Sequence, residues 1–386
     1  MRPRVSRLAR RTLAVGVALV TTLALAPAAR AAGSEPDWRT VRNTPVTGVH
    51  RDVVAVSAHD AWAVGRERTT KGSSTLVERW DGQKWRRVSV PGADRGWLTG
   101  VDAASSDNVW AVGTTHGKGP KFLHWDGRQW STVPPASPPG NEHPGSDDLK
   151  DVAAVSGNDA WAVGLHWPSG SNPTTLIEHW DGQKWSRVPS PNPGTRGQSL
   201  EAVSAVSATD VWAVGYKNTG LEKKSRAIAL HWDGQKWRTT PMELPRGNSQ
   251  LFAVNAVSSD NVWAVGARDG EPFTMHWDGS RWRMLPRAPA KTNVRLRAVT
   301  PDGRGGVWVA GTAWSSNKAG VSPAYFHWDG DTWTKGTSQA PEGRVYGLAV
   351  ASSGPGGTST WAAGTKAWCQ CQLAPTLIAV NGETPR

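Results

Sequence analysis

One alternation of short apolar stretches and polar turns repeats along most of the chain. In a complete copy, a Val/Ala-rich run at 200–206 precedes Val-Trp-Ala-Val-Gly at 211–215, an apolar run at 227–232 and a short stretch at 237–240. Each stretch has the length of a strand, is rich in Val and Trp, and is bounded by Gly, Pro, Asn or Asp. No helical periodicity of useful length follows the N-terminal segment. The pattern predicts units of four antiparallel strands, a to d.

Three tryptophans mark each unit. The first, on strand b, recurs every 45 to 53 residues, at Trp62, Trp110, Trp161, Trp212, Trp263, Trp308 and Trp361. The second ends strand c, at Trp80, Trp125, Trp180, Trp232, Trp277 and Trp328. The third begins strand d, at Trp85, Trp130, Trp185, Trp237, Trp282 and Trp333. A four-stranded unit of this length, repeated seven times, predicts an all-β, seven-bladed β-propeller.

The last unit lacks its strand d. Near the start of the chain, residues 37–41 (Asp-Trp-Arg-Thr-Val) match the strand d residues 84–88. We expect this N-terminal strand to complete the last blade, because ring closure removes two exposed sheet edges. The predicted domain is 32–386, with blades at about 48–91, 98–135, 149–189, 200–241, 251–286, 294–336, and 343–382 plus 37–41.

Twenty of the 24 Trp residues occupy repeat positions, which indicates a structural role between blades. Each buried indole covers roughly 200 Å², worth about 5 kcal/mol before entropy is counted. An Asp-Gly pair follows the second Trp in six units and predicts a tight turn. If that turn is Asp-Gly-x-x, Trp80 and Trp85 lie opposite each other, although spacing alone leaves the turn length open.

The first 31 residues have the layout of a secretory signal. Five Arg and no acid occupy residues 2–11, an uncharged run covers 13–26, and Ala29-Arg30-Ala31 offers a cleavage site. The apolar run is shorter than the roughly 20 residues that a membrane span needs. Residues 8–13 resemble a twin-arginine signal except at Ala9, so the export route stays open. We therefore predict a secreted protein.

Charge argues against a nucleic-acid partner. The signal holds six of the 44 Lys and Arg and none of the 32 Asp and Glu, which leaves 38 bases, 32 acids and a net charge of +6. These bases are scattered among the repeats rather than gathered in a stripe. No later segment is apolar enough to span a bilayer. We expect a monomer that binds an extracellular glycan or protein.

The repeat resembles secreted bacterial, particularly actinobacterial, propellers with Trp-Ala-Val-Gly and Trp-Asp-Gly-x-x-Trp blades, over about residues 37–382. It is more distantly similar to WD40, kelch and Asp-box propellers. It lacks the WD40 Gly-His and the kelch Gly-Gly doublet, and its Asp and Gly are adjacent, unlike those of the Asp box. The resemblance implies a seven-bladed fold and does not assign an activity, since this fold hosts lectins, scaffolds and enzymes.

The two faces of such a ring differ. Short a–b and c–d connections share one face, here called the c–d face. Longer, varied connections share the other, the d–a face; they cover 66–74, 165–173, 216–226, 312–323, 365–375 and 134–148. The four Trp outside the repeat fall on the d–a face and are candidate platforms for a sugar ring or anchors for a protein, unless they pack onto the ring: Trp97, Trp167, Trp314 and Trp368.

Catalytic signatures are weak. Five His precede Trp-Asp-Gly in separate blades and cannot share a metal, whereas His143 and His166 are candidate ligand-binding residues in d–a-face loops. Nucleophile, zinc and phosphate-loop motifs are missing, and the sequence shows no arginine cluster. Cys369 and Cys371 are a candidate disulfide; a soft-metal site is the alternative.

These features predict a non-catalytic secreted binding module without a cofactor. The expected ligand is carbohydrate or a cell-envelope polymer, bound through the d–a face. A protein–protein scaffold using the same face is one alternative. A hydrolase or lyase with its site at the mouth of the central channel is another.

Overall fold

The computed structural model describes residues 37–41, 46–70, 72–93, 96–115, 119–136, 145–220, 224–290, 293–314, 320–340, 342–352, 358–365 and 376–381. All regular elements in these ranges are β-strands. None of the described residues forms a helix that is long and apolar enough to cross a bilayer.

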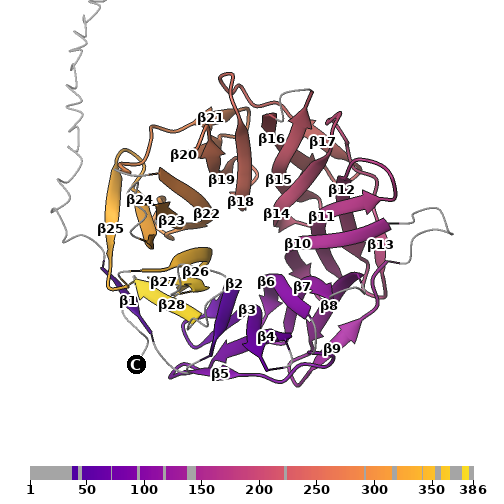
Figure 1. Ribbon diagram of the computed structural model, residues 1–386, viewed down its shortest axis with the longest axis vertical. Coiled ribbons are helices and arrows are strands. Elements are labelled where there is room, and N and C mark those ends of the chain that lie inside the picture. Colours follow the sequence, from indigo (N-terminus) through magenta and orange to yellow (C-terminus); the bar gives the residue numbers. More distant parts are fainter. Residues whose placement is uncertain are drawn as a thin grey trace, which may run out of the picture. The chain divides into compact units, whose positions relative to one another are not determined.

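The strands form seven four-stranded antiparallel blades arranged in a ring (Figure 1). Blade 1 has β2 (Gly48–Ser57), β3 (Asp60–Thr69), β4 (Gly72–Trp80) and β5 (Trp85–Arg87). Blade 2 has β6 (Gly96–Ser105), β7 (Asn108–Thr115), β8 (Gly119–Trp125) and β9 (Trp130–Val133). Blade 3 has β10 (Gly145–Ser156), β11 (Asp159–Pro168), β12 (Thr174–Trp180) and β13 (Trp185–Arg187). Blade 4 has β14 (Gln198–Ser207), β15 (Asp210–Thr219), β16 (Lys224–Trp232) and β17 (Trp237–Thr240).

The remaining blades follow the same order of strands. Blade 5 has β18 (Ser249–Ser258), β19 (Asn261–Arg268), β20 (Glu271–Trp277) and β21 (Trp282–Met284). Blade 6 has β22 (Asn293–Pro301), β23 (Val307–Trp314), β24 (Val321–Trp328) and β25 (Trp333–Ser338). Blade 7 has β26 (Arg344–Ser352), β27 (Thr358–Thr365), β28 (Thr376–Asn381) and, from the N-terminal region, β1 (Asp37–Thr40).

The ring closes as the sequence predicts. Each innermost strand contacts the next, and β26 of blade 7 contacts β2 of blade 1. Strand β1 pairs antiparallel with β28, with Arg39 opposite Val380 and Thr40 opposite Ala379. It also pairs parallel with β25 through Asp37 and Trp38, which joins blades 6 and 7 into one eight-stranded sheet. The sequence did not predict this second pairing.

The Asp-Gly turns have the four-residue form. Trp80 lies directly opposite Trp85 across β4 and β5. In the turn between them, Oδ1 of Asp81 accepts the backbone N–H groups of Gln83 and Lys84 at 3.0 and 2.8 Å. Gly82 has a φ of 89°, a conformation that a side chain would strain. The turn therefore satisfies its own polar groups and sets the register of strands c and d.

The cores lie between adjacent blades and are built from tryptophan. Trp62 of blade 1 is fully buried against Trp125 and Trp130 of blade 2, with ring centroids 5.0 and 5.2 Å away. At the closure, Trp38 meets the edge of Trp308 at 5.4 Å and stacks on Tyr325 at 4.1 Å. Trp38 is completely buried, so the N-terminal strand belongs to the core of the ring.

Several connections predicted as loops are extensions of strands. β3 and β4 pair as far as Thr69 and Gly72, and β15 and β16 as far as Thr219 and Lys224. Extended hairpins satisfy backbone groups that a free loop would leave to water. In these two hairpins, the described parts of the variable stretches are paired strands.

Candidate binding site

Every innermost strand carries a β-bulge at the same place. In β10, for example, the pairing with β11 jumps from Leu149 to Asp151 and leaves Lys150 without a partner on the ladder. A bulge re-aims the side chain that it carries. The seven bulge residues, one per blade, are Arg51, Thr99, Lys150, Glu201, Phe252, Arg297 and Tyr346.

All seven bulge residues line the central channel, which has a cavity of about 400 Å³. A second cavity of about 390 Å³, the mouth cavity, is lined by the same seven with Arg66, Trp97 and Asp148. Trp97 and Asp148 lie near the start of their inner strands, and Arg66 lies toward the end of strand b. The mouth cavity is therefore on the d–a face, and its volume falls within the range of about 300–1,000 Å³ typical of ligand pockets.

One arc of the mouth is basic and aromatic. It runs through blades 5, 6, 7 and 1 and carries Phe252, Arg297, Tyr346 and Arg51 in that order. The guanidinium carbon of Arg297 is 4.4 Å from the centre of the Phe252 ring, and that of Arg51 is 4.7 Å from the Tyr346 ring. Stacking on a ring holds a guanidinium in place without neutralising it.

The opposite arc carries both signs of charge. Lys150 pairs with Asp148 at 2.6 Å, and Asp148 also accepts the hydroxyl of Thr114 at 3.1 Å. Glu201 accepts the hydroxyl of Ser199 at 2.7 Å. Blade 3 therefore holds a compensated pair, and blade 4 adds a carboxylate.

The arginines of the basic arc lack such compensation. Arg51, Arg66 and Arg297 form no ion pair with any residue that the structure describes. Burial, followed by the nearby Arg295, lowers the pKa of Arg297 to about 10. Burial also lowers the pKa of Arg51; Tyr346 opposes this shift, and Arg66 adds to it. This arc is a concentration of positive charge with little solvent around it.

Deeper in the channel the lining includes acidic side chains. Asp52 accepts the N–H groups of Val53 in its own blade and Val101 in the next, both at 2.9 Å. Asp151 joins blades 3 and 4 in the same way, through Val152 and Val203 at 2.8 and 2.9 Å.

A third carboxylate, Asp102, accepts the N–H of Ala154 in the next blade at 2.9 Å. Burial raises the pKa of Asp102 to about 6 and that of Asp151 to about 7. Burial also raises the pKa of Asp52 well above its usual range, with a contribution from Asp151. These carboxylates link blades 1 to 4, each to the next, along the channel.

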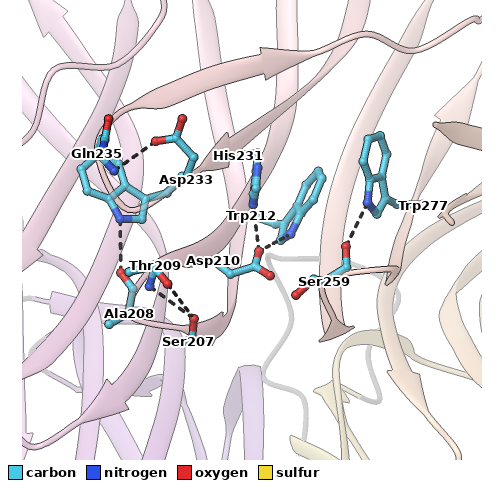
Figure 2. A network of polar contacts seen from close by, with 11 residues as sticks. Ser207, Ala208, Thr209, Asp210, Trp212, His231, Asp233, Gln235, Ser259 and Trp277 are labelled. Atoms are coloured by element: carbon cyan, nitrogen blue, oxygen red, sulfur yellow. Dashed lines mark hydrogen bonds and ion pairs between the residues drawn. The ribbon is translucent and has the colours of Figure 1, made fainter. Parts of the chain in front are cut away.

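The repeated histidines have a structural role near the c–d face (Figure 2). His231 Nε2 lies 2.8 Å from Asp210 Oδ1, which also accepts the indole N–H of Trp212 at 2.9 Å. The imidazole stacks on Trp212 at 4.3 Å. In blade 1, Arg79 takes the place of histidine and binds Asp60 through two hydrogen bonds. The repeated Asp before strand b therefore anchors a strand c side chain in these blades, in addition to its position in a turn. Within the described ranges, no group of three or more His, Cys, Asp or Glu is arranged to hold a metal ion.

The aromatic candidates from the sequence are not brought together in one place. Trp97 lines the mouth cavity and is half-buried. Trp167 lies near the end of β11 with 48% of its surface exposed. Trp314 ends β23, and its ring is 5.8 Å from the guanidinium of Arg295. Neither Trp167 nor Trp314 is a lining residue of the mouth cavity. Trp368 lies outside the described residues.

The other candidates have separate outcomes. His166 does not lie in a loop, because β11 extends through it and pairs it with Asp147 of β10. Its imidazole is buried, and its Nδ1 lies 2.6 Å from Asp147 Oδ1. His143, Cys369 and Cys371 fall outside the described residues.

The bulge residues were missed, although the repeat contained a signal for them. They follow the inner Leu of strand a (His or Val in two blades) and precede Asp, Gly or Ala, then Val or Leu. Between these restricted positions stand Arg, Thr, Lys, Glu, Phe, Arg and Tyr. Alignment of the seven units would have shown one variable column within a restricted strand. The arginine cluster that the sequence did not reveal arises here and from the neighbouring strand ends.

No protein-family model matches the chain, and no curated protein matches it either. Solved structures with a similar fold include YCF48 bound to D1 peptide, with 16% identity and a TM-score of 0.56 over 89% of this chain and 94% of that one. The six-bladed fucose-binding lectin of the fungus Aleuria aurantia has 13% identity and a TM-score of 0.50, over 76% and 97%. The GH74 xyloglucanase of Xanthomonas campestris has 15% identity and a TM-score of 0.54, over 88% of this chain and 55% of that one. At these identities the likeness shows the β-propeller fold alone.

Proposed function

We propose that the protein is an exported, non-catalytic β-propeller that binds a carbohydrate or a cell-envelope polymer at the mouth cavity. The observation that carries this proposal is the ring of bulge residues. One position per blade varies in charge, size and aromaticity, while the positions around it are restricted and hold the frame. Variable side chains on a rigid scaffold are the usual arrangement of a binding surface. The N-terminal pattern of residues 1–31 supports export.

The chemistry of the mouth favours binding over hydrolysis. Most glycoside hydrolases use two carboxyl groups, one on each side of the scissile bond. The carboxylates of the mouth cavity are Glu201 and Asp148, and Asp148 is held by Lys150 and Thr114. Those of the channel, such as Asp52, are engaged by backbone N–H groups. Trp97 and Phe252 offer flat apolar rings on which a sugar can stack.

Binding to arrayed glycans and isolated cell-envelope polymers tests the proposal. We expect retention of at least one polymer and a loss of affinity of about fivefold or more in Trp97→Ala and Phe252→Ala, because stacking contributes about 1 kcal/mol or more per ring. Trp167→Ala is the matched control, since its exposed indole is not part of the mouth cavity.

Two results would contradict the proposal. One is silent arrays together with capture of a discrete protein partner, which would assign the face to protein–protein contact. The other is turnover of a bound polymer, which would make the protein an enzyme.

A further inference from the structure

The basic arc contains arginines that have no ion pair with any described residue. Positive side chains in protein interiors are normally paired, because removing an unpaired charge from water is costly. Here Arg51, Arg66 and Arg297 face one cavity without an ion pair to any described residue. At the same mouth, Lys150 does have a carboxylate partner, Asp148, two residues away on β10 at 2.6 Å. Among the described residues, the arginines of the basic arc thus differ from Lys150 in having no carboxylate at ion-pair distance.

The guanidinium groups of the arc are also held in place by aromatic rings, which suits them to bind a planar group such as a carboxylate. Phe252 and Tyr346 lie beneath the guanidinium groups of Arg297 and Arg51, at 4.4 and 4.7 Å. A guanidinium held in this way keeps its N–H groups free for a carboxylate, which it can bind through two parallel hydrogen bonds. The aromatic rings also reduce the entropy that long side chains lose when a ligand binds.

The depth of the channel limits where an anion can bind. Asp52 and Asp151 directly follow the bulge residues Arg51 and Lys150 and line the channel below the mouth. Asp52, Asp102 and Asp151 are acceptors engaged by backbone N–H groups, so this part of the channel lining offers an anionic group acidic side chains instead of arginines. An anion is therefore favoured at the mouth and disfavoured further in.

We propose that the group recognised in the mouth cavity is the carboxylate of an acidic sugar, bound by Arg51, Arg66 and Arg297 while the sugar ring lies against Trp97. This inference rests on the proposed function and names the class of saccharide. A peptide strand is less well served, because inner-strand N–H groups such as those of Val53, Val101 and Val203 already donate to channel carboxylates. A saccharide needs no such backbone edge, only side-chain donors and flat apolar surfaces.

Titration calorimetry with two matched pairs of probes tests the inference. One pair is trigalacturonate and its methyl ester; the other is sialyllactose and lactose. We expect the acidic member of at least one pair to bind at least tenfold more tightly than its neutral counterpart. Arg297→Gln and Arg51→Gln should lower the affinity for the acidic member more than the affinity for the neutral member, so that the preference is lost. The preference should also weaken as salt concentration rises.

Arg281→Gln is the charge-matched control, because Arg281 is exposed in an Asp-Gly turn on the c–d face. If a Gln variant unfolds at a lower temperature, Arg297→Lys and Arg51→Lys replace it. They keep the positive charge but lose the planar fork, so a partial loss of the preference is expected.

Equal binding of the acidic and neutral members would overturn the inference and leave the proposed function standing. Binding of an acidic peptide through the same arginines, with all saccharides silent, would overturn both.

Discussion

The Asp-Gly turns of the c–d face and the mouth of the channel both contain arginines, with opposite outcomes. At the turns, Arg86, Arg238 and Arg283 bind the turn aspartate of their own blade at 2.5–2.6 Å, and more than half of each side chain is exposed. At the mouth, Arg51 and Arg297 are largely withdrawn from water and lie on aromatic rings instead of carboxylates.

The difference distinguishes residues that hold the fold together from residues whose polar groups are available to a ligand. A turn that satisfies its own donors and acceptors has nothing left to offer a ligand, and it recurs almost unchanged from blade to blade. At the mouth, Arg51 and Arg297 have no ion-pair partner among the described residues, at some cost to stability, which is typical of binding sites. The tryptophan-packed blades between the two faces stabilise the fold and so offset this loss of stability.

The largest effect is expected in that shared frame, from Trp38→Ala. Trp38 is fully buried between Trp308 and Tyr325 and anchors the strand that closes the ring. Loss of a buried indole costs about 3–5 kcal/mol. Urea unfolding should show this decrease, and Trp167→Ala, with its exposed indole, should change stability little. A small effect of Trp38→Ala would mean that closure does not hold the frame.

An intermediate effect is expected from pH, with opposite signs at the two regions. Arginine and backbone hydrogen bonds lower the pKa of Asp81 and Asp233 at the turns, so their contribution is lost only as pH falls into the strongly acidic range. Burial raises the pKa of Asp102 to about 6 and of Asp151 to about 7. The folded state therefore retains protons that the unfolded chain has already released.

The free energy of unfolding should consequently fall as pH rises from about 4 to about 7, by about 2–3 kcal/mol for each of Asp102 and Asp151. Chemical denaturation across this range measures the slope. Asp102→Asn should flatten it, whereas Asp181→Asn, at a turn, should leave it unchanged. A slope that Asp102→Asn does not alter would remove the channel carboxylates as its source.

The smallest effect is expected from removing an unpaired charge at the mouth cavity, which should change the stability of the fold. Arg297→Met keeps the length of the side chain but removes the uncompensated charge, so stability should rise by up to about 1 kcal/mol. Arg283→Met, at a turn, should not stabilise the fold, because it breaks a satisfied pair. Thermal and urea unfolding of the two variants compare the regions directly. If Arg297→Met destabilised the protein, the guanidinium would be a structural element rather than part of an incomplete site.

The seven-bladed ring was predictable from the sequence because the residues that determine it recur in each blade. The spacing of Trp62, Trp110 and their counterparts gave the blades, and the likeness of residues 37–41 to strand d gave the closure. The candidate site was harder to predict from the sequence. Lys150 and Arg297 sit in continuous strand patterns, and only the pairing of neighbouring strands shows that they are bulges pointing into the channel. His166 was misplaced for a related reason, because β11 extends past the repeat and buries it against Asp147.

The double pairing of β1 has a consequence for how the molecule assembles. The first strand of the ring to be synthesised is among the last to find its partners, since β25 and β28 lie about 300 and about 340 residues further along the chain. Until then blade 7 has an open edge and Trp308 lacks its neighbour Trp38. Contacts between such distant segments form slowly, because a long stretch of chain must first be brought together. We therefore expect strand β1 to pair late in folding. Before it pairs, the open edge of blade 7 is available for association with other copies of the chain.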